Sequence, residues 1–302
     1  MNTATNVLDC AIVGAGVAGL TAALYLGRFR RNVTVIDGGP SRASWIPEIH
    51  NYPGIMGSSG QHFLSQLRQQ ALRYGANIQP GWVTKIDRTA NGVFVVETKE
   101  NSICAFNVIV ATGIEDDLAD IANAEDAVKA ARLCLCPVCD GYEAIDREIA
   151  CLISPDNIDH ALFLRTYTSR LTAVIARRAD KNLTGRQKRV LEDASIEVIA
   201  GDFAICVDAD HADIKTGSGK SLSFDRLYCL MGSLPGNGFL RQVGPEMDRS
   251  GKIITDLHQQ TSVAGLYAAG DVTAGLCQIA VATGEGATAA AHIHSRLPSD
   301  PR

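Results

Sequence analysis

The chain lacks the features that mark nucleic-acid-binding and membrane proteins. Its 302 residues carry a net charge of -5, so there is no basic excess to attract nucleic acid or anionic lipid. The apolar stretch 7–27 contains Asp9 and has no Lys or Arg before Arg28, so it lacks the positive segment of a signal peptide. No later run reaches the ~20 apolar residues of a membrane span. We therefore expect a cytoplasmic protein with no nucleic-acid or membrane partner.

The sequence also lacks the cysteine pattern of a secreted disulfide scaffold, because nine cysteines are spread over the whole chain. Three of them lie in apolar, strand-like runs and are expected to be small buried hydrophobes: Cys10, Cys151 and Cys229. Cys134, Cys136 and Cys139 form a cluster, but no second pair and no nearby His completes a four-ligand shell. We expect no metal.

The order of apolar runs predicts an α/β fold with two Rossmann-like, three-layer nucleotide-binding domains, the second inserted into the first. Two strand–helix–strand units are expected, at 8–13, 17–30 and 33–36 and again at 148–153, 157–168 and 171–176. A turn-rich return segment, a strand at 265–268 and a helix at about 276–295 follow the second unit. We expect one discontinuous domain, 1–114 and 231–302, and an inserted domain, 115–230, that carries the cysteine cluster.

A glycine turn lies between the first strand and the first helix, in Gly14-Ala15-Gly16-Val17-Ala18-Gly19. In such a G-x-G-x-x-G, Gly14 permits the tight turn, Gly16 lets the backbone approach a pyrophosphate, and Gly19 lets helix and strand pack closely. The helix N-terminus offers free N–H groups to the phosphates. Asp37, about twenty residues further on, is placed to hydrogen-bond a ribose hydroxyl. The pattern predicts a dinucleotide site.

A C-x-x-C followed by an acid occurs at Cys136-Pro137-Val138-Cys139-Asp140. Two intervening residues allow two thiols to close a disulfide in a short turn, and such motifs lower the pKa of one thiol. Asp140 is placed to take and return protons during thiol exchange. We predict a redox-active dithiol.

Two further motifs carry a family resemblance. Residues 266–272, Leu-Tyr-Ala-Ala-Gly-Asp-Val, resemble the second FAD fingerprint of flavoprotein reductases, and Ala111-Thr112-Gly113 resembles their mid-chain ATG element. With the glycine turn and the C-x-x-C, the order of motifs resembles low-molecular-weight thioredoxin reductase over nearly the whole chain. The resemblance implies that FAD is the cofactor, that 1–114 and 231–302 bind it, that 115–230 is an NADPH-domain-like insertion, and that the protein is a homodimer.

The resemblance also assigns roles to residues. Cys139 is expected to exchange electrons with the flavin, Cys136 to attack the partner disulfide, and Asp140 to act as the acid–base. The set expected to hold FAD is Gly14, Ala15, Gly16, Ala18, Gly19, Asp37, Gly38, Asn51, Val83, Ala111, Thr112, Gly113, Gly270, Asp271, Gln278 and Ile279.

One segment departs from the family. The expected second nucleotide turn reads Ser154-Pro155-Asp156-Asn157-Ile158-Asp159 and contains no glycine. Side chains stand where backbone should approach a pyrophosphate, Pro155 removes an N–H donor, and two aspartates add negative charge. Arg177-Arg178 lies where the family binds the 2′-phosphate, and we interpret this pair as a remnant. We do not expect NADPH to bind in the usual mode.

Flavin and dithiol without nicotinamide resemble the pyridine-nucleotide-independent branch, which includes ferredoxin-linked thioredoxin reductases and dithiol oxidases that use oxygen. We expect an FAD-dependent dithiol–disulfide oxidoreductase whose partner is a thioredoxin-like protein or a small-molecule dithiol or disulfide. The direction of electron flow stays open, with ferredoxin or oxygen as the second electron partner. The alternatives are an NADPH-dependent thioredoxin-disulfide reductase and a non-catalytic flavin-binding redox sensor.

Overall fold

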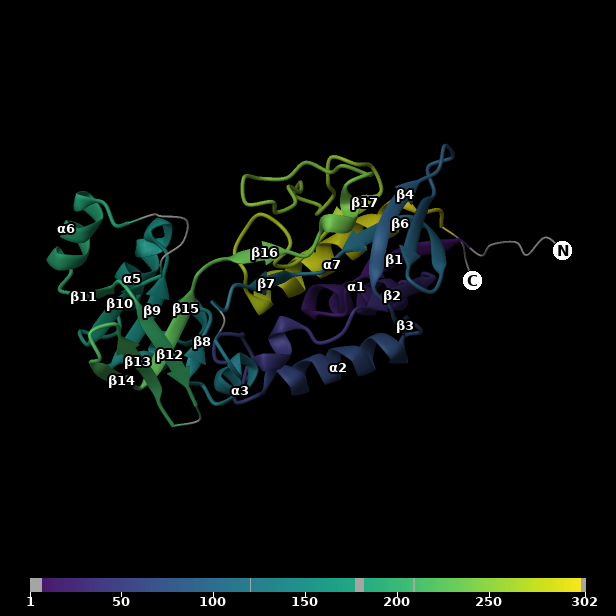
Figure 1. Cartoon of the computed structure of the whole chain (residues 1–302). Helices are drawn as coiled ribbons and strands as arrows, with labels where there is room; N and C mark the ends of the chain where they lie inside the picture. The colour runs from purple at the N-terminus through teal and green to yellow at the C-terminus, as the bar shows by residue number, and fades with distance from the viewer. Residues whose placement is uncertain (1–6, 120, 177–181, 209, 300–302) are drawn as a thin grey trace.

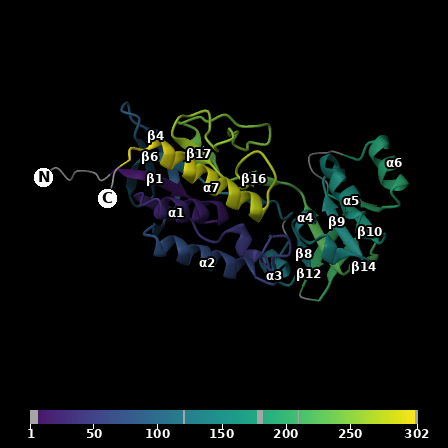
Figure 2. The same cartoon turned by 180° about the vertical axis from the view of Figure 1, so that it is seen from behind.

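The computed structural model describes residues 7–119, 121–176, 182–208 and 210–299. Figure 1 shows two units side by side, one built around each of two sheets, with the first and last described elements, β1 (Leu8–Val13) and α7 (Ile279–Arg296), both in the first unit. Figure 2 shows the same arrangement from behind. The predicted class, an α/β fold with two Rossmann-like sheets, is confirmed.

The first sheet has the order β3-β2-β1-β6-β5-β4, with β17 paired to β6. Its strands are β1 (Leu8–Val13), β2 (Val33–Asp37), β3 (Asn77–Pro80), β4 (Val83–Arg88), β5 (Phe94–Thr98), β6 (Ser102–Val110) and β17 (Leu266–Ala268). The parallel strands β1, β2, β3, β6 and β17 all point the same way, so their carboxyl ends meet at one edge of the sheet. That edge carries the glycine turn.

Three helices cover one face of the first sheet: α1 (Val17–Arg28), α2 (Gly60–Arg73) and α7 (Ile279–Arg296) (Figure 2). Successive side chains of β1 point to opposite faces of the sheet, as they do in any β-strand. Cys10 and Ile12 pack on the helix side, whereas Ala11 and Val13 pack on the other side. Both faces of β1 are therefore buried.

The second sheet is fully parallel and has the order β11-β10-β9-β15-β8. Its strands are β8 (Leu133–Cys134), β9 (Ile149–Ile153), β10 (Leu171–Ile175), β11 (Glu197–Ala200) and β15 (Arg226–Leu230). Helices α5 (Ile158–Leu164) and α6 (Gly185–Asp193) pack on one face. The other face packs against an antiparallel meander of β12 (Phe203–Val207), β13 (Ala212–Thr216) and β14 (Ser221–Phe224), together with α3 (Ala124–Lys129).

A two-stranded antiparallel ribbon, β7 (Ile114–Asp116) with β16 (Ser233–Pro235), joins the two units. Both chain crossings therefore run side by side. We propose on this basis that the domain boundaries fall at 114/115 and 230/231. The remaining short elements are η1 (Arg42–Trp45), α4 (Pro137–Asp140), η2 (Tyr142–Ala144), η3 (Pro155–Asn157) and η4 (Gly238–Leu240).

The helix predicted over 157–168 is wrong in length, because α5 ends at Leu164. Beyond it the backbone N–H groups of Thr166 and Tyr167 donate to the carbonyl oxygens three residues back, those of Phe163 and Leu164. This is the hydrogen-bond pattern of a 3₁₀ turn, which ends the α-helix. The last helix begins at Ile279 rather than near 276. Arg177-Arg178 lies outside the described residues.

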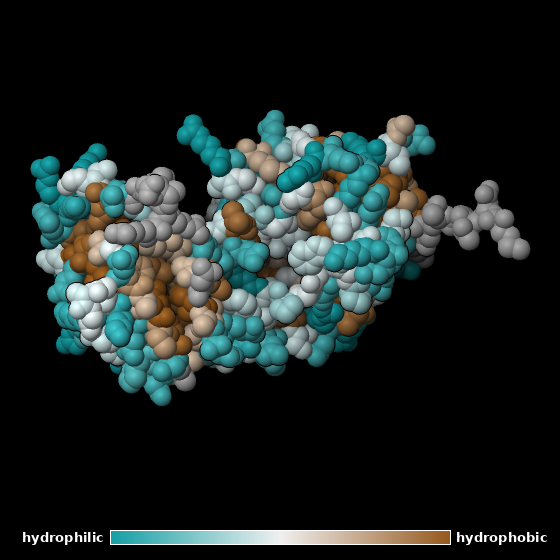
Figure 3. Space-filling model, viewed as in Figure 1, coloured by the Kyte–Doolittle hydropathy of each residue, from teal (hydrophilic) through white to brown (hydrophobic). Residues whose placement is uncertain are grey.

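On the face drawn in Figure 3, apolar surface is unevenly distributed. Figure 3 shows its larger apolar areas over the inserted unit, while the visible face of the first unit is mainly hydrophilic. None of the helices within the described ranges combines the length and the apolar character needed to cross a membrane.

The packing of α7 against α1 gives a stability prediction with an internal control. A Cβ added at Gly286 would stand 2.3 Å from the carbonyl oxygen of Ala18, whereas one at Gly284 would meet nothing within 4 Å. Gly286→Ala should therefore destabilise the protein by roughly 1–3 kcal/mol through overpacking. Gly284→Ala should be neutral or stabilising by up to about 1 kcal/mol, because alanine favours the helix. Thermal unfolding of the two variants tests this, and equal stabilities would contradict it.

Candidate redox and cofactor site

The glycine turn after β1 is dictated by close backbone approaches. Gly14 has φ +107°, and a Cβ there would lie 2.4 Å from the carbonyl oxygen of Ala111. A Cβ at Gly19 would lie 2.0 Å from the carbonyl oxygen of Gly14. Gly16 is less confined, with Ser41 Oγ 3.3 Å from its hypothetical Cβ. These contacts agree with the turn and packing roles inferred from the sequence.

A cavity of about 1010 Å³ runs from this turn to the inserted unit. That volume lies at the upper end of cofactor and ligand sites, about 300–1,000 Å³. The predicted site residues on its wall are Gly14, Ala15, Gly16, Ala18, Gly38, Asn51, Val83, Ala111, Thr112, Gly113, Cys136, Cys139, Asp140, Gly270, Asp271, Gln278 and Ile279. The structure thus brings the two outer chain segments and the C-x-x-C to one space.

Two predicted residues are not among those that line the cavity. Gly19 packs against Gly14 behind the turn. Asp37 forms an ion pair with Arg68 of α2 and accepts a hydrogen bond from the Gly39 backbone N–H at 3.0 Å. The ribose contact predicted for Asp37 stays a prediction.

The cavity wall fits a dinucleotide such as FAD. The N-terminus of α1 has no acidic residue in its first turn and no side-chain cap at Gly16, so its N–H groups remain available for phosphate. Thr112 Oγ1 is buried and has no hydrogen-bond partner among the described residues, as expected for a group that awaits a ligand. Asp271 also lines the cavity; burial raises the pKa of its carboxyl, and the nearby positive charges of Arg42 and Lys252 partly offset that rise. These groups would hold the phosphates and hydroxyls of the cofactor.

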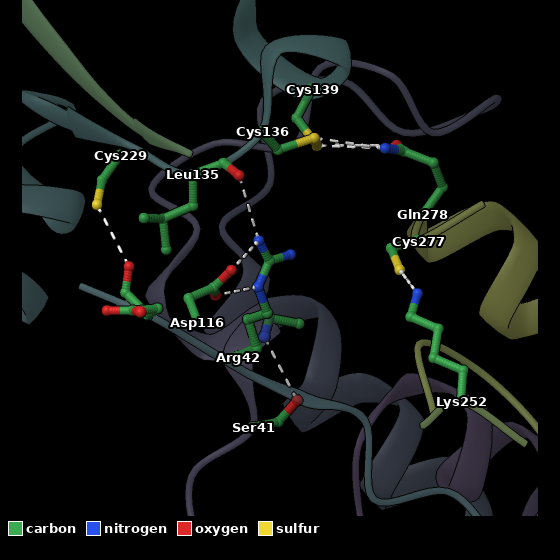
Figure 4. Close-up of polar contacts among 12 residues, drawn as sticks. Ser41, Arg42, Asp116, Leu135, Cys136, Cys139, Cys229, Lys252, Cys277 and Gln278 are labelled. Carbon is green, nitrogen blue, oxygen red and sulfur yellow. Dashed lines mark hydrogen bonds and ion pairs between the residues drawn. A yellow bond between two sulfur atoms is a disulfide. The ribbon is translucent and has the colours of Figure 1, made fainter. Parts of the chain in front are cut away.

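Cys136 and Cys139 form a disulfide across α4, with their Cα atoms 5.3 Å apart. Gln278, the residue before α7, points its amide at the disulfide (Figure 4), with Nε2 3.4 Å from each sulfur. Asn51 Nδ2 donates to Gln278 Oε1 at 2.8 Å and lies 3.4 Å from the carbonyl oxygen of Val138. The first unit therefore holds the disulfide at the cavity wall through two amide side chains.

Asp140 closes the helix that carries the disulfide. Burial raises the pKa of its carboxyl, and interactions with Tyr228, Cys134 and Arg226 partly offset that rise. Oδ1 is buried without a hydrogen-bond partner in the described part of the chain. A carboxyl with a raised pKa beside a dithiol suits proton exchange near neutral pH.

Two charged side chains of the site, Arg42 and Lys252, make polar contacts that carry no sequence signal. Arg42 Nη2 lies 3.1 Å from Asp116 Oδ1 and 3.5 Å from the carbonyl oxygen of Leu135, so it links η1 to the residue before Cys136 (Figure 4). Lys252 Nζ lies 3.0 Å from the sulfur of Cys277, which is also on the cavity wall. The residues in these contacts are 25 to 93 positions apart along the chain, so no local sequence pattern predicts that they meet.

The expected second nucleotide turn is packed with protein groups. After β9, Ser154 and Pro155 are buried. The carbonyl oxygen of Pro155 accepts a hydrogen bond from Gln187 Nε2 at 2.6 Å, and Asn157 Nδ2 donates to the carbonyl oxygen of Leu230 at 3.3 Å. No described residue between 141 and 225 lines the large cavity. Nowhere in the described part of the chain do three or more His, Cys, Asp or Glu residues form a group that could hold a metal ion.

Comparisons with known proteins agree with this geometry. The model of the pyridine nucleotide-disulphide oxidoreductase family matches residues 8–147 and 161–286. A thioredoxin reductase of Treponema pallidum is 33% identical over 297 residues, covering 93% of this chain and 94% of that protein. The crystal structure of thioredoxin reductase from Streptococcus pyogenes has a TM-score of 0.85 at 26% identity, covering 97% of this chain and 98% of its own. A crystal structure of HlmI has a TM-score of 0.87 at 28% identity, covering 97% and 93%.

The chain belongs to the pyridine nucleotide-disulphide oxidoreductase family. Within it, the chain is a thioredoxin reductase-like flavoprotein, a flavin-dependent disulfide oxidoreductase whose cofactor is FAD.

Proposed function

We propose that this enzyme passes electrons between FAD and the Cys136–Cys139 pair, and between that pair and a thiol or disulfide partner, without NADPH. Bound FAD supplies the acceptor or donor of an electron pair. The observation that carries the proposal is the turn after β9: Ser154 and Pro155 are buried there, Gln187 bonds the carbonyl oxygen of Pro155, and Asn157 bonds that of Leu230 at the end of β15. In a dinucleotide site this place must leave N–H groups and room for a pyrophosphate.

The thiol chemistry follows from the site residues. A dithiol partner would attack Cys136 as a thiolate, forming a mixed disulfide and releasing Cys139 as a thiolate. The partner's second thiolate would then displace Cys136, so that the partner leaves oxidised and the pair is left reduced. Asp140 would take the proton of each incoming thiol and return it to a leaving sulfur. The same steps in reverse would reduce a partner disulfide.

The partner is proposed to be a thioredoxin-like protein or a small-molecule dithiol or disulfide. The curated relatives are named thioredoxin reductases, which supports the first. The cavity reaches the disulfide between apolar residues of both units, Trp45, Leu118 and Leu135, which supports the second. Ferredoxin or oxygen is proposed as the second electron partner, and a homodimer as the assembly.

NADPH-dependent thioredoxin reduction is the second candidate function. The names of the relatives favour thioredoxin reduction, and the name of the family favours a pyridine nucleotide. A non-catalytic redox sensor is disfavoured because the disulfide, Asp140 and Gln278 converge on one cavity.

An anaerobic absorbance experiment separates the first two candidates. Mixing the oxidised holoenzyme with NADPH should leave the flavin absorbance unchanged, because the glycine-free turn at 154–159 presents side chains and Pro155, which has no N–H, where a pyrophosphate needs backbone N–H groups. Dithiothreitol added to the same sample should bleach the flavin, which controls for its ability to be reduced. Rapid bleaching by NADPH would instead establish the second candidate.

A further inference from the structure

Three side chains of the inserted sheet lie beneath the disulfide helix on one face. Strands β15 and β8 are parallel neighbours with Tyr228 opposite Cys134. Because alternate residues of a strand share a face, Arg226 lies on the same face as Tyr228. Tyr228 and Cys134 belong to one core cluster, whereas Leu227 and Leu133, one residue earlier, belong to the cluster on the other face. The register therefore presents Arg226, Tyr228 and Cys134 together toward α4.

Tyr228 holds the end of the disulfide helix. Its side chain is fully buried, and its hydroxyl donates to the backbone carbonyl oxygen of Asp140 at 3.0 Å. The last carbonyl groups of a helix have no partner within the helix, and a buried phenol needs a hydrogen-bond partner of its own. One bond satisfies both groups and ties the backbone of Asp140 to β15.

Arg226 is a charged side chain on the same part of the cavity wall as Asp140. Arg226, Cys134 and Asp140 all line the cavity that the disulfide lines. Burial and the like charge of Glu143 on η2 oppose ionisation of Asp140, whereas Tyr228, Cys134 and Arg226 favour it. Burial also raises the pKa of Cys134 well above its ordinary value, so Cys134 stays a neutral thiol and Arg226 is the cation of this group.

We propose that Tyr228 and Arg226 are positioning residues for Asp140: Tyr228 fixes the place of the carboxyl beside the disulfide, and Arg226 keeps it ionised between turnovers. The proposal rests on the proposed acid–base role of Asp140. An ionised carboxylate accepts the proton of the incoming thiol, the resulting thiolate forms the mixed disulfide as the Cys136–Cys139 bond breaks, and the released sulfur takes that proton back. Proton and electron pair both balance within the site.

The test measures flavin reduction by dithiothreitol in the holoenzyme as a function of pH, by anaerobic stopped flow. The plot of rate against pH should have an acidic limb, on which the rate falls as the pH is lowered. In Arg226→Met this limb should move to higher pH, because loss of the cation makes the Asp140 carboxyl harder to ionise. At pH values on that limb the rate should fall roughly threefold or more. Arg226→Lys keeps the charge and should restore the wild-type limb. Tyr228→Phe should move the limb the same way and also lower the plateau.

Tyr267→Phe is the matched control, because Tyr267 is an equally buried tyrosine that hydrogen-bonds in the first unit and does not line the cavity. It should leave the pH profile unchanged. Variants of Arg226 and Tyr228 that lose thermal stability or flavin but keep the wild-type pH profile would overturn the proposal, since such a result is a purely structural effect.

The Asp140→Asn variant separates this proposal from the proposed function. If it keeps the wild-type pH profile, the acid–base role of Asp140 is wrong. If it alone changes the profile, only the positioning role of Arg226 and Tyr228 is wrong.

Discussion

Cys139→Ser is expected to abolish reduction of the bound flavin by dithiothreitol. A serine oxygen cannot close the disulfide with Cys136 and cannot carry an electron pair from sulfur to the cofactor, so no thiol route remains. The rate should fall by about 10³-fold or more, which corresponds to about 4 kcal/mol of activation free energy. Anaerobic stopped-flow absorbance of the flavin, at equal flavin content, measures it.

Cys206→Ser supplies the control, since Cys206 is an exposed cysteine of β12 that does not line the cavity. That variant should reduce its flavin at the wild-type rate. A Cys139→Ser protein that still bleaches as fast as wild type would exclude electron transfer through this disulfide.

Asp140→Asn should make the protein more stable at neutral pH and much less active. Burial raises the pKa of Asp140 above its ordinary value of 3.8, so the native carboxyl binds its proton more tightly than the unfolded one. The stability linked to that proton is fully present below the unfolded pKa and is lost as pH rises through the folded pKa. At neutral pH the wild type therefore bears the cost of a buried charge, and asparagine removes it.

The stability gain of Asp140→Asn should shrink on acidification and vanish below the pKa of the unfolded carboxyl. Thiol-driven flavin reduction should meanwhile fall by about 10²–10⁴-fold, the usual contribution of an acid–base group. Thermal unfolding across pH, paired with stopped-flow rates, measures both. Asp210→Asn, at an exposed position, should stay within about 0.5 kcal/mol of wild type. A gain that is larger in acid than at neutral pH would reverse the assigned sign.

Local patterns predicted the parts of the site that depend on short stretches of chain. The roles of Gly14 and Gly19 could be inferred because a strand–turn–helix leaves no room for a Cβ at these positions. The structure shows the close backbone contacts that exclude a Cβ at each. The C-x-x-C could be inferred because two intervening residues suit a disulfide, which the structure contains. Gln278 and Asn51 came only from the family resemblance, since nothing in the sequence around them indicates a contact with sulfur.

Long-range contacts could not be predicted from the sequence. The approach of Tyr228 to Asp140 joins residues 88 apart and depends on the register of β15 against β8, and β8 is only two residues long. The meander β12–β14 and helix α6 were also not predicted, although the capping box of Thr184 and Gln187 at the start of α6 is a local sequence signal. Sequence reasoning therefore found the motifs but not the groups that support them.

Helix α7 contacts two parts of the site that are far apart along the chain, the disulfide and the helix that follows the glycine turn. Its N-terminus follows Gln278 at the disulfide, and its body packs Gly286 against Ala18, in the helix that follows the glycine turn. A substitution that pushes these helices apart would shift the amide away from sulfur and distort the phosphate turn in the same movement. Loss of cofactor and loss of thiol chemistry should thus arise together from mutations at the contact between α1 and α7, including at Gly286, which does not line the cavity.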